Sequence, residues 1–236
     1  MSKNIAIIPA RGGSKRVPKK NIKLFLGKPI IAYALETAIN SNLFDEIMVS
    51  TDDSEIAGIS KKFGAKIPFM RTEATSDDHA TLSEVIVEIL ENYMQRNIEF
   101  ENLCCILPTS PLISSTNIKK GYELLMNSEF TSVTPVIQFS YPILRSLSFT
   151  KNHFLKMNWP EHLKTRSQDL PPAFHDAGSF YWVNTKIFLK ENTLFTERGT
   201  GLILSEKEAQ DIDTNDDWEL AEMKYKLLYG EKKGHI

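Results

Sequence analysis

Residues 5–10 read Ile5-Ala6-Ile7-Ile8-Pro9-Ala10, an uninterrupted apolar run that stops where a basic segment begins. A half-exposed strand would alternate apolar and polar residues, so this run predicts a strand buried on both faces of a sheet. Residues 29–40 then follow a helical pattern, with Pro29 suited to the first helical position and apolar residues at Ile30, Ile31, Ala34, Leu35 and Ala38. The chain therefore opens with a strand, a loop and a helix.

The same alternation of strand and helix patterns continues along the chain. Further strands are predicted over residues 46–50, 66–70, 103–107 and 132–137, and helices over 54–64, 82–93, 118–126 and 216–228. Ser54 is the expected cap of the first of these helices, and Thr214 with Asp217 caps the last. The alternation predicts an α/β fold with an open, mostly parallel sheet, in which ligands bind beyond the carboxyl ends of the strands.

A different pattern occupies residues 138–184, where aromatic residues and prolines separate short extended segments. We interpret this stretch as a small β-rich insertion into one α/β domain, formed by residues 1–137 and 185–236. Its aromatic residues suit a subunit interface or a tightly packed loop region, and the sequence favours neither.

Composition limits the classes of partner and compartment. The 28 basic and 30 acidic residues nearly cancel, which gives no whole-molecule reason to expect a nucleic acid or an anionic membrane as partner. Neither a signal peptide nor an apolar run of roughly 20 residues is recognisable, so we expect a cytoplasmic protein. Cys104 and Cys105 are adjacent in an apolar run, where alternation sends them to opposite faces of a strand as core residues.

The loop after the first strand holds five basic residues between positions 11 and 20. Such a loop fits a polyphosphate, because Gly12 and Gly13 let backbone amides approach oxygens while Arg11, Lys15 and Lys20 neutralise the charge of a leaving pyrophosphate. The basic residues alone also suit a solvated surface loop or a loose nucleic-acid contact. Their position after a buried strand favours the phosphate site.

Near the other end, Asp211-Ile212-Asp213 directly precedes the last helix. In an extended segment both carboxylates face the same way while Ile212 points into the core. Two hard oxygen ligands fit Mg²⁺, which borrows its other ligands from water and substrate phosphates. Such a pair caps helices about as often as it binds metal, and the basic loop favours the metal site.

Residues 8–21 resemble the IPARxxSKxxPxKN signature of the CMP-sugar synthetases, the cytidylyltransferases that act on sialic, legionaminic and pseudaminic acids. The resemblance implies a doubly wound, Rossmann-like nucleotidyltransferase fold. The residues it implies around CTP are Ala10, Arg11, Gly12, Ser14, Lys15, Lys20, Asn21, Arg71 and Thr81.

Two further segments bear on the sugar. Residues 107–112 resemble a QPTSPLR segment of the sialic and legionaminic acid branches, with Leu107 in place of its glutamine. Residues 166–182 resemble the RSQDLP and HDAGxFYW pattern of the pseudaminic acid branch, although Ser179 replaces an expected glutamine. The candidate sugar contacts are Pro108, Thr109, Ser110, Arg166, Gln168, His175 and Tyr181; a structural role is equally open for His175.

The resemblance implies transfer of CMP from CTP to the anomeric hydroxyl of a nonulosonic acid, with pseudaminic acid favoured over legionaminic, sialic and 3-deoxy-octulosonic acids. The implied catalytic residues are Arg11, Lys15, Lys20, Asp211 and Asp213, the last two holding Mg²⁺. It also implies a homodimer in which the insertion reaches into the partner's active site. The alternative from another class is a nucleic-acid-binding protein, which the balanced charge and the acidic pair disfavour.

Overall fold

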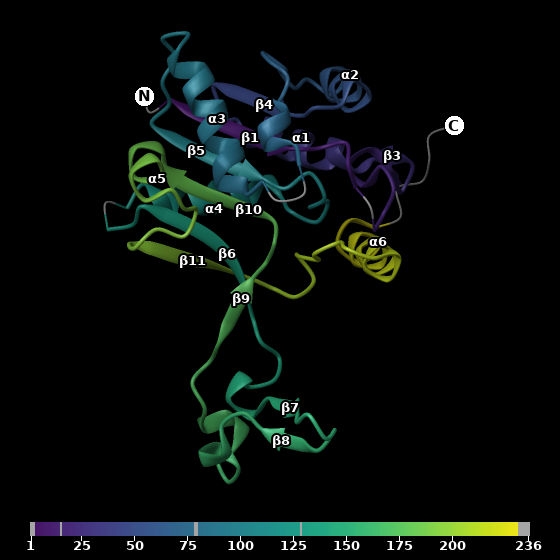
Figure 1. Ribbon diagram of the computed structural model, residues 1–236, viewed down its shortest axis with the longest axis vertical. Helices are drawn as coiled ribbons and strands as arrows, with labels where there is room; N and C mark the ends of the chain where they lie inside the picture. Colours follow the sequence, from purple (N-terminus) through teal and green to yellow (C-terminus); the bar gives the residue numbers. More distant parts are fainter. Residues whose placement is uncertain (1–2, 15, 78–79, 128, 231–236) are drawn as a thin grey trace.

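The structure, a computed structural model, describes residues 3–14, 16–77, 80–127 and 129–230. One predicted site residue, Lys15, lies outside these ranges. The chain folds into an α/β body from which a narrow arm projects (Figure 1). Within the described residues no helix is both long and apolar enough to cross a bilayer.

The body is built on one central sheet with the strand order β11-β6-β10-β5-β1-β4. These strands are β1 (Asn4–Pro9), β4 (Glu46–Ser50), β5 (Asn102–Ile106), β6 (Ser132–Gln138), β10 (Phe180–Asn184) and β11 (Gly199–Leu204). Strand β1 pairs in parallel with β4 and β5, and β11 with β6, whereas β10 runs antiparallel to both of its neighbours. The predicted mostly parallel sheet is confirmed.

Helices cover both faces of the sheet. On one face, α1 (Ile30–Ser41), α2 (Ser54–Lys62) and α4 (Ser115–Leu125) pack against Ala6 and Ile8 of β1; on the other, α3 (Leu82–Met94) and α5 (Thr185–Glu191) pack against Ile5 and Ile7. Because both faces are covered, β1 is a continuous apolar run. Cys104 and Cys105 join opposite clusters, as alternation predicts.

The last helix, α6 (Asn215–Tyr229), packs beside the start of the chain rather than on the sheet. Phe25 lies in β2 (Leu24–Phe25), which pairs with β3 (Lys28–Pro29), and its ring meets Trp218 and Tyr225 of α6 edge-on. Ile212 is fully buried in the same cluster. This packing holds residues 211–213 against the basic loop.

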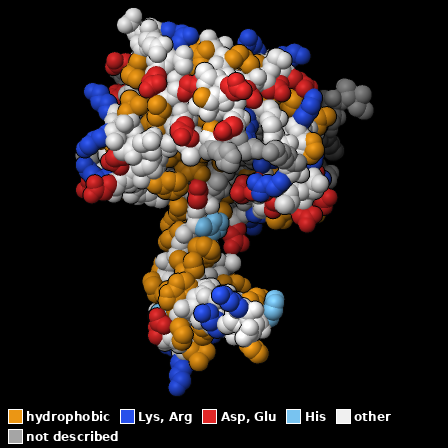
Figure 2. Space-filling view, viewed as in Figure 1, with side chains coloured by type: hydrophobic (Ala, Val, Ile, Leu, Met, Phe, Trp, Pro, Cys, Tyr) orange, Lys and Arg blue, Asp and Glu red, His pale blue; other side chains and the backbone are white. Residues whose placement is uncertain are grey.

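The arm consists of η3 (Ile143–Arg145), β7 (Leu147–Phe149), β8 (Leu155–Met157), η4 (Pro160–His162) and η5 (Ser167–Asp169). Strands β7 and β8 form a separate hairpin, and β9 (Phe174–Asp176) leads back to the body by pairing with β6. Apolar side chains gather along the arm and along the narrow connection between the arm and the body (Figure 2).

Several predicted boundaries are wrong. Residues 180–184, assigned to the insertion, form β10 in the middle of the central sheet. Asp53, not Ser54, caps α2 by accepting hydrogen bonds from the amides of Glu55 and Ile56. The strand expected over residues 66–70 is reduced to a single bridge between Met48 and Lys66.

Candidate active site

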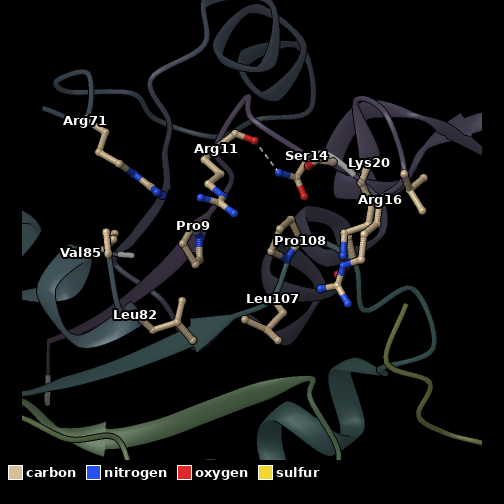
Figure 3. A pocket seen from close by; sticks show the side chains of 14 residues that line it. Pro9, Arg11, Ser14, Arg16, Lys20, Arg71, Leu82, Val85, Leu107 and Pro108 are labelled. Carbon is tan, nitrogen blue, oxygen red and sulfur yellow. Dashed lines mark hydrogen bonds between the residues drawn. The ribbon is translucent and has the colours of Figure 1, made fainter. Parts of the chain in front are cut away.

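A cleft of about 570 Å³ opens at the carboxyl ends of β1 and β5, where ligands bind in doubly wound sheets. Its walls come from the basic loop after β1, the segment after β5 and the start of α3 (Figure 3). The lining residues are Pro9, Arg11, Ser14, Arg16, Val17, Lys20, Asn21, Arg71, Ala80, Leu82, Val85, Leu107, Pro108 and Thr109.

The basic loop is held in shape by hydrogen bonds within the loop and by hydrogen bonds to residues outside it. The Asn21 side-chain amide donates to the carbonyl of Arg11 at 2.9 Å, and the amide of Gly12 donates to Asp52 Oδ1 at 2.9 Å. A Cβ at Gly12 would lie 2.8 Å from Asp53 Oδ2 and 3.1 Å from Asp53 Cβ, so a larger residue would displace the Asp53 side chain. Arg11 Nη1 donates to the carbonyl of Asp77 at 2.7 Å. The loop is therefore preorganised.

Arg71 is the buried cation of the cleft, with 9% of its surface exposed. Its Nε donates to Ser50 Oγ at 3.0 Å and its Nη2 to the carbonyl of Ser50 at 2.8 Å, which fixes the guanidinium at the end of β4. Burial lowers the pKa of Arg71, and the carboxylates of Asp52 and Glu88 oppose that shift. The side chains of Arg11 and Arg71 point toward the same opening (Figure 3).

The acidic pair meets the basic loop at the edge of the cleft. Asp213 Oδ2 lies 2.9 Å from Arg16 Nη1, and Asp213 Oδ1 lies 3.4 Å from Lys20 Nζ. Lys20 also donates to the carbonyl of Ile212 at 2.6 Å. Burial and the neighbouring Asp213 raise the pKa of Asp211, while Lys20 opposes the shift. The basic loop and the segment that carries the acidic pair are therefore in direct contact.

Asp211 lines a second cavity, of about 410 Å³. It is lined by Ile137, Gln138, Phe139, Ser140, His175, Asp176, Ala177, Glu206, Ala209, Gln210, Asp211 and Lys224. The His175 ring packs against Phe139 with centroids 5.0 Å apart, and Asp176 accepts a hydrogen bond from the Tyr181 hydroxyl at 2.6 Å. Asp211 lines this cavity, whereas Asp213, two residues on, contacts Arg16 and Lys20, which line the first cleft.

Other predicted site residues divide between cleft, core and arm. Pro108 and Thr109 line the cleft, as does Leu107. Ser110 Oγ donates to the backbone carbonyls of residues 178 and 179, both at 3.3 Å, and Ala10 is buried in the core.

Thr81 has a structural role at the start of α3. Its hydroxyl accepts from the amide of Glu84 and donates to the Glu84 carboxylate, which makes it the N-cap of α3. The adjacent Ala80 and Leu82 line the cleft, and Thr81 does not.

Arg166 and Gln168 lie on the arm, at the start of η5 and within it, and neither lines the cleft or the second cavity. Arg166 pairs with Asp169, its Nε lying 2.9 Å from Oδ2. A single chain therefore does not bring these two residues to the cleft.

Four residues of the site were not predicted: Arg16, Asp52, Asp176 and Lys224. Arg16 stands within the basic signature, and Asp52 directly follows the second strand. Asp176 stands within the HDAG segment, whereas Lys224 carries no local pattern, because only tertiary packing brings α6 to the second cavity.

A doubly wound sheet with a preorganised basic loop and a carboxylate pair at one cleft defines a nucleotide-using enzyme of the α/β class. The chain belongs to the cytidylyltransferase family, whose model matches residues 5–229.

Individual relatives match along nearly the whole chain. Pseudaminic acid cytidylyltransferase of Campylobacter jejuni subsp. jejuni serotype O:23/36 (strain 81-176) is 41% identical over 95% of this chain and 97% of its own. CMP-N,N'-diacetyllegionaminic acid synthase of Legionella pneumophila is 31% identical over 92% of this chain and 94% of its own. The solved structure of CMP:2-keto-3-deoxy-manno-octonic acid synthetase complexed with CTP shares the fold, with a TM-score of 0.68 and 19% identity over 94% of this chain and 98% of that one.

Proposed function

We propose that this protein transfers CMP from CTP to the anomeric hydroxyl of a nonulosonic acid, with pseudaminic acid as the preferred acceptor. The observation that carries the proposal is the meeting of Lys20 with Asp213, 3.4 Å apart, at the edge of the cleft. The cations that would bind phosphate and the carboxylates that would bind a metal thus lie next to each other. The 41% identity to a pseudaminic acid cytidylyltransferase supports the choice of sugar.

The triphosphate of CTP binds between the basic loop and Arg71. Arg11, Lys20 and Arg71 offer cations from different sides of the cleft. Nucleotidyl transfer requires little covalent chemistry from the protein, so these groups act by positioning the nucleotide and neutralising charge on the departing pyrophosphate.

The acceptor sugar binds in the second cavity, whose volume of about 410 Å³ is in the range of small-molecule sites. Gln138, Ser140 and His175 offer hydrogen bonds to hydroxyl and amide groups there. Asp211 lines this cavity, and Asp213, two residues on, contacts Lys20 of the first cleft. The sugar hydroxyl and the α-phosphorus of CTP therefore meet beside the acidic pair. The oxygen–phosphorus bond forms as the bond to pyrophosphate breaks, and the hydroxyl proton passes to solvent.

Mg²⁺ is the proposed metal. Asp211 and Asp213 offer hard carboxylate oxygens two residues apart, next to cations that bind phosphate. Two carboxylates would leave coordination positions that phosphate and water would complete. The metal supplies Lewis-acid stabilisation of the phosphoryl oxygens.

The assembly is a homodimer that works in the cytoplasm, and its product feeds surface glycosylation such as flagellin modification. The exposed aromatic side chains of the arm support the dimer: Tyr141 is 85% exposed and Phe149 and Phe154 are each 72% exposed. A partner chain would also bring Arg166 and Gln168 to an active site.

The test incubates purified protein with CTP, Mg²⁺ and a panel of pseudaminic, legionaminic, sialic and 3-deoxy-octulosonic acids. Pyrophosphate release and product mass are measured. We expect the CMP-sugar from pseudaminic acid at the highest kcat/KM, and no turnover by Asp213→Ala at an unchanged thermal midpoint. Absence of pyrophosphate with every sugar, or full turnover by Asp213→Ala, would overturn the proposal.

A further inference from the structure

The negative charge of the second cavity disfavours the binding of an acidic sugar. Three carboxylates line it, those of Asp176, Glu206 and Asp211. Among the described lining residues, Lys224 is the one Lys or Arg side chain. A carboxylate entering a partly enclosed site beside other carboxylates needs a cation close to it.

Lys224 extends from α6 and is held without a carboxylate partner. Its Nζ donates to the carbonyl of Ala209 and to Gln210 Oε1, both at 2.9 Å. An ammonium group has three N–H donors, so one is left for a ligand. None of the ion pairs among the described residues involves Lys224, although Glu206 is near enough to oppose the lowering of its pKa by burial.

We propose that Lys224 binds the carboxylate of the acceptor sugar and thereby selects acidic over neutral sugars. This inference rests on the proposed function and assigns a specificity residue to it. An ammonium contact is a charge-assisted hydrogen bond, stronger than the neutral hydrogen bonds available from the rest of the cavity.

The chemistry of the acceptor determines where its carboxylate contact must lie. In a nonulosonic acid the carboxylate carbon is bonded directly to the anomeric carbon, so the cation that binds the acid lies close to the reacting hydroxyl. Lys224 and Asp211 line the same cavity. Gln210 joins them, since its Oε1 accepts from Lys224 and its Nε2 donates to the carbonyl of Asp211 at 3.1 Å.

The competing explanation is a purely structural one, in which Lys224 only fixes residues 209 and 210 in front of the acidic pair. A structural clamp would affect all acceptors and CTP alike. A carboxylate contact affects the acid alone, and an acceptor analogue with a carboxamide in place of the carboxylate separates the two cases.

The experiment compares the wild type with Lys224→Met, Lys224→Arg and, as matched control, Lys226→Met on the exposed side of the same helix. The affinity of each protein for pseudaminic acid and for its carboxamide is measured by calorimetry, and KM for both substrates is measured by pyrophosphate release. We expect Lys224→Met to weaken acid binding at least ~10-fold while carboxamide binding and the KM for CTP stay unchanged. Lys224→Arg keeps the preference for the acid, and Lys226→Met behaves as the wild type.

An equal loss for acid and carboxamide, or an unchanged ratio between them in Lys224→Met, would overturn the inference. The calorimetric readout does not require turnover. If the wild type binds the acid but releases no pyrophosphate, the proposed function fails while the assignment of Lys224 stands. If turnover is normal and the acid preference survives Lys224→Met, only the assignment fails.

Discussion

Asp213 faces two cations at once, Arg16 at 2.9 Å and Lys20 at 3.4 Å. Both carboxylate oxygens are thus engaged in the ligand-free chain. A bound triphosphate offers the same two cations a greater negative charge, so nucleotide binding would release Asp213 for a metal ion. Asp213 would therefore link nucleotide binding to binding of the proposed metal.

We predict that Mn²⁺, used as a spectroscopic substitute for Mg²⁺, binds at least ~10-fold more tightly with CTP present than without it. Part of that increase comes from phosphate oxygens acting as ligands. Arg16→Ala should tighten metal binding in the nucleotide-free protein, because it removes the closer competitor for Asp213. Electron paramagnetic resonance titration measures free Mn²⁺ directly; equal affinity of wild type and Arg16→Ala for the metal without CTP would contradict the idea.

At the scale of elements, helix α3 begins with a reciprocal cap that bears on pH stability. The Thr81 amide donates to Glu84 Oε2 at 2.7 Å, and the Thr81 hydroxyl bonds to the same carboxylate. These two hydrogen bonds lower the pKa of Glu84 from its ordinary value of 4.5. A lowered pKa in the folded state means that the ionised carboxylate stabilises the fold above the unfolded pKa, and that this stabilisation disappears as the pH falls through the folded pKa.

The corresponding prediction compares urea unfolding of the wild type and Glu84→Gln from pH 7 to about 3.5. The wild type should be the more stable protein above about pH 5.5, with the difference shrinking as acid is added. Thr81→Ala, which removes the hydroxyl partner, should cost ~1 kcal/mol at pH 7 and flatten this pH dependence. A difference between wild type and Glu84→Gln that grows on acidification would show the opposite sign and refute the argument.

The elements also show what the sequence could and could not predict. Buried strands such as β1 and amphipathic helices such as α3 have strong periodicity and were predicted to within a few residues. Strand β10 was missed because Phe180-Tyr181-Trp182 follows an aromatic-rich segment and looked continuous with it. Strand β11 was also not predicted, because Gly199 and Gly201 weaken the strand pattern.

Some features of the candidate site were likewise predictable from the sequence, and others were not. The basic loop and the acidic pair were each recognisable from local residue types, and the family resemblance predicted that they meet. Local patterns could not supply the contact between Lys20 and Asp213, which are 193 residues apart. Thr81 was assigned to the nucleotide because a hydroxyl suits a ribose and a helix cap equally well.

For the whole molecule, the arm is the part that a single chain leaves unexplained. It carries exposed apolar side chains, including Tyr141, Phe149 and Phe154, and projects from the body (Figure 2). It also carries Arg166, whose sequence context suggested a sugar contact. A twofold dimer would bury the aromatic surface and bring each arm to the other chain's active site.

This arrangement predicts complementation between two inactive variants. Asp213→Ala damages the cleft of its own chain, whereas Arg166→Ala damages the cleft of its partner. In an equimolar mixture of exchanging chains half of the dimers are mixed, and each mixed dimer contains one site with both residues intact. The mixture should therefore regain about one quarter of the wild-type rate of pyrophosphate release, although each variant alone is inactive. Doubly tagged mixed dimers, isolated in two affinity steps, should have about half of the wild-type rate. If Arg166 served its own chain, each site of a mixed dimer would lack one of the two residues, and no activity would return.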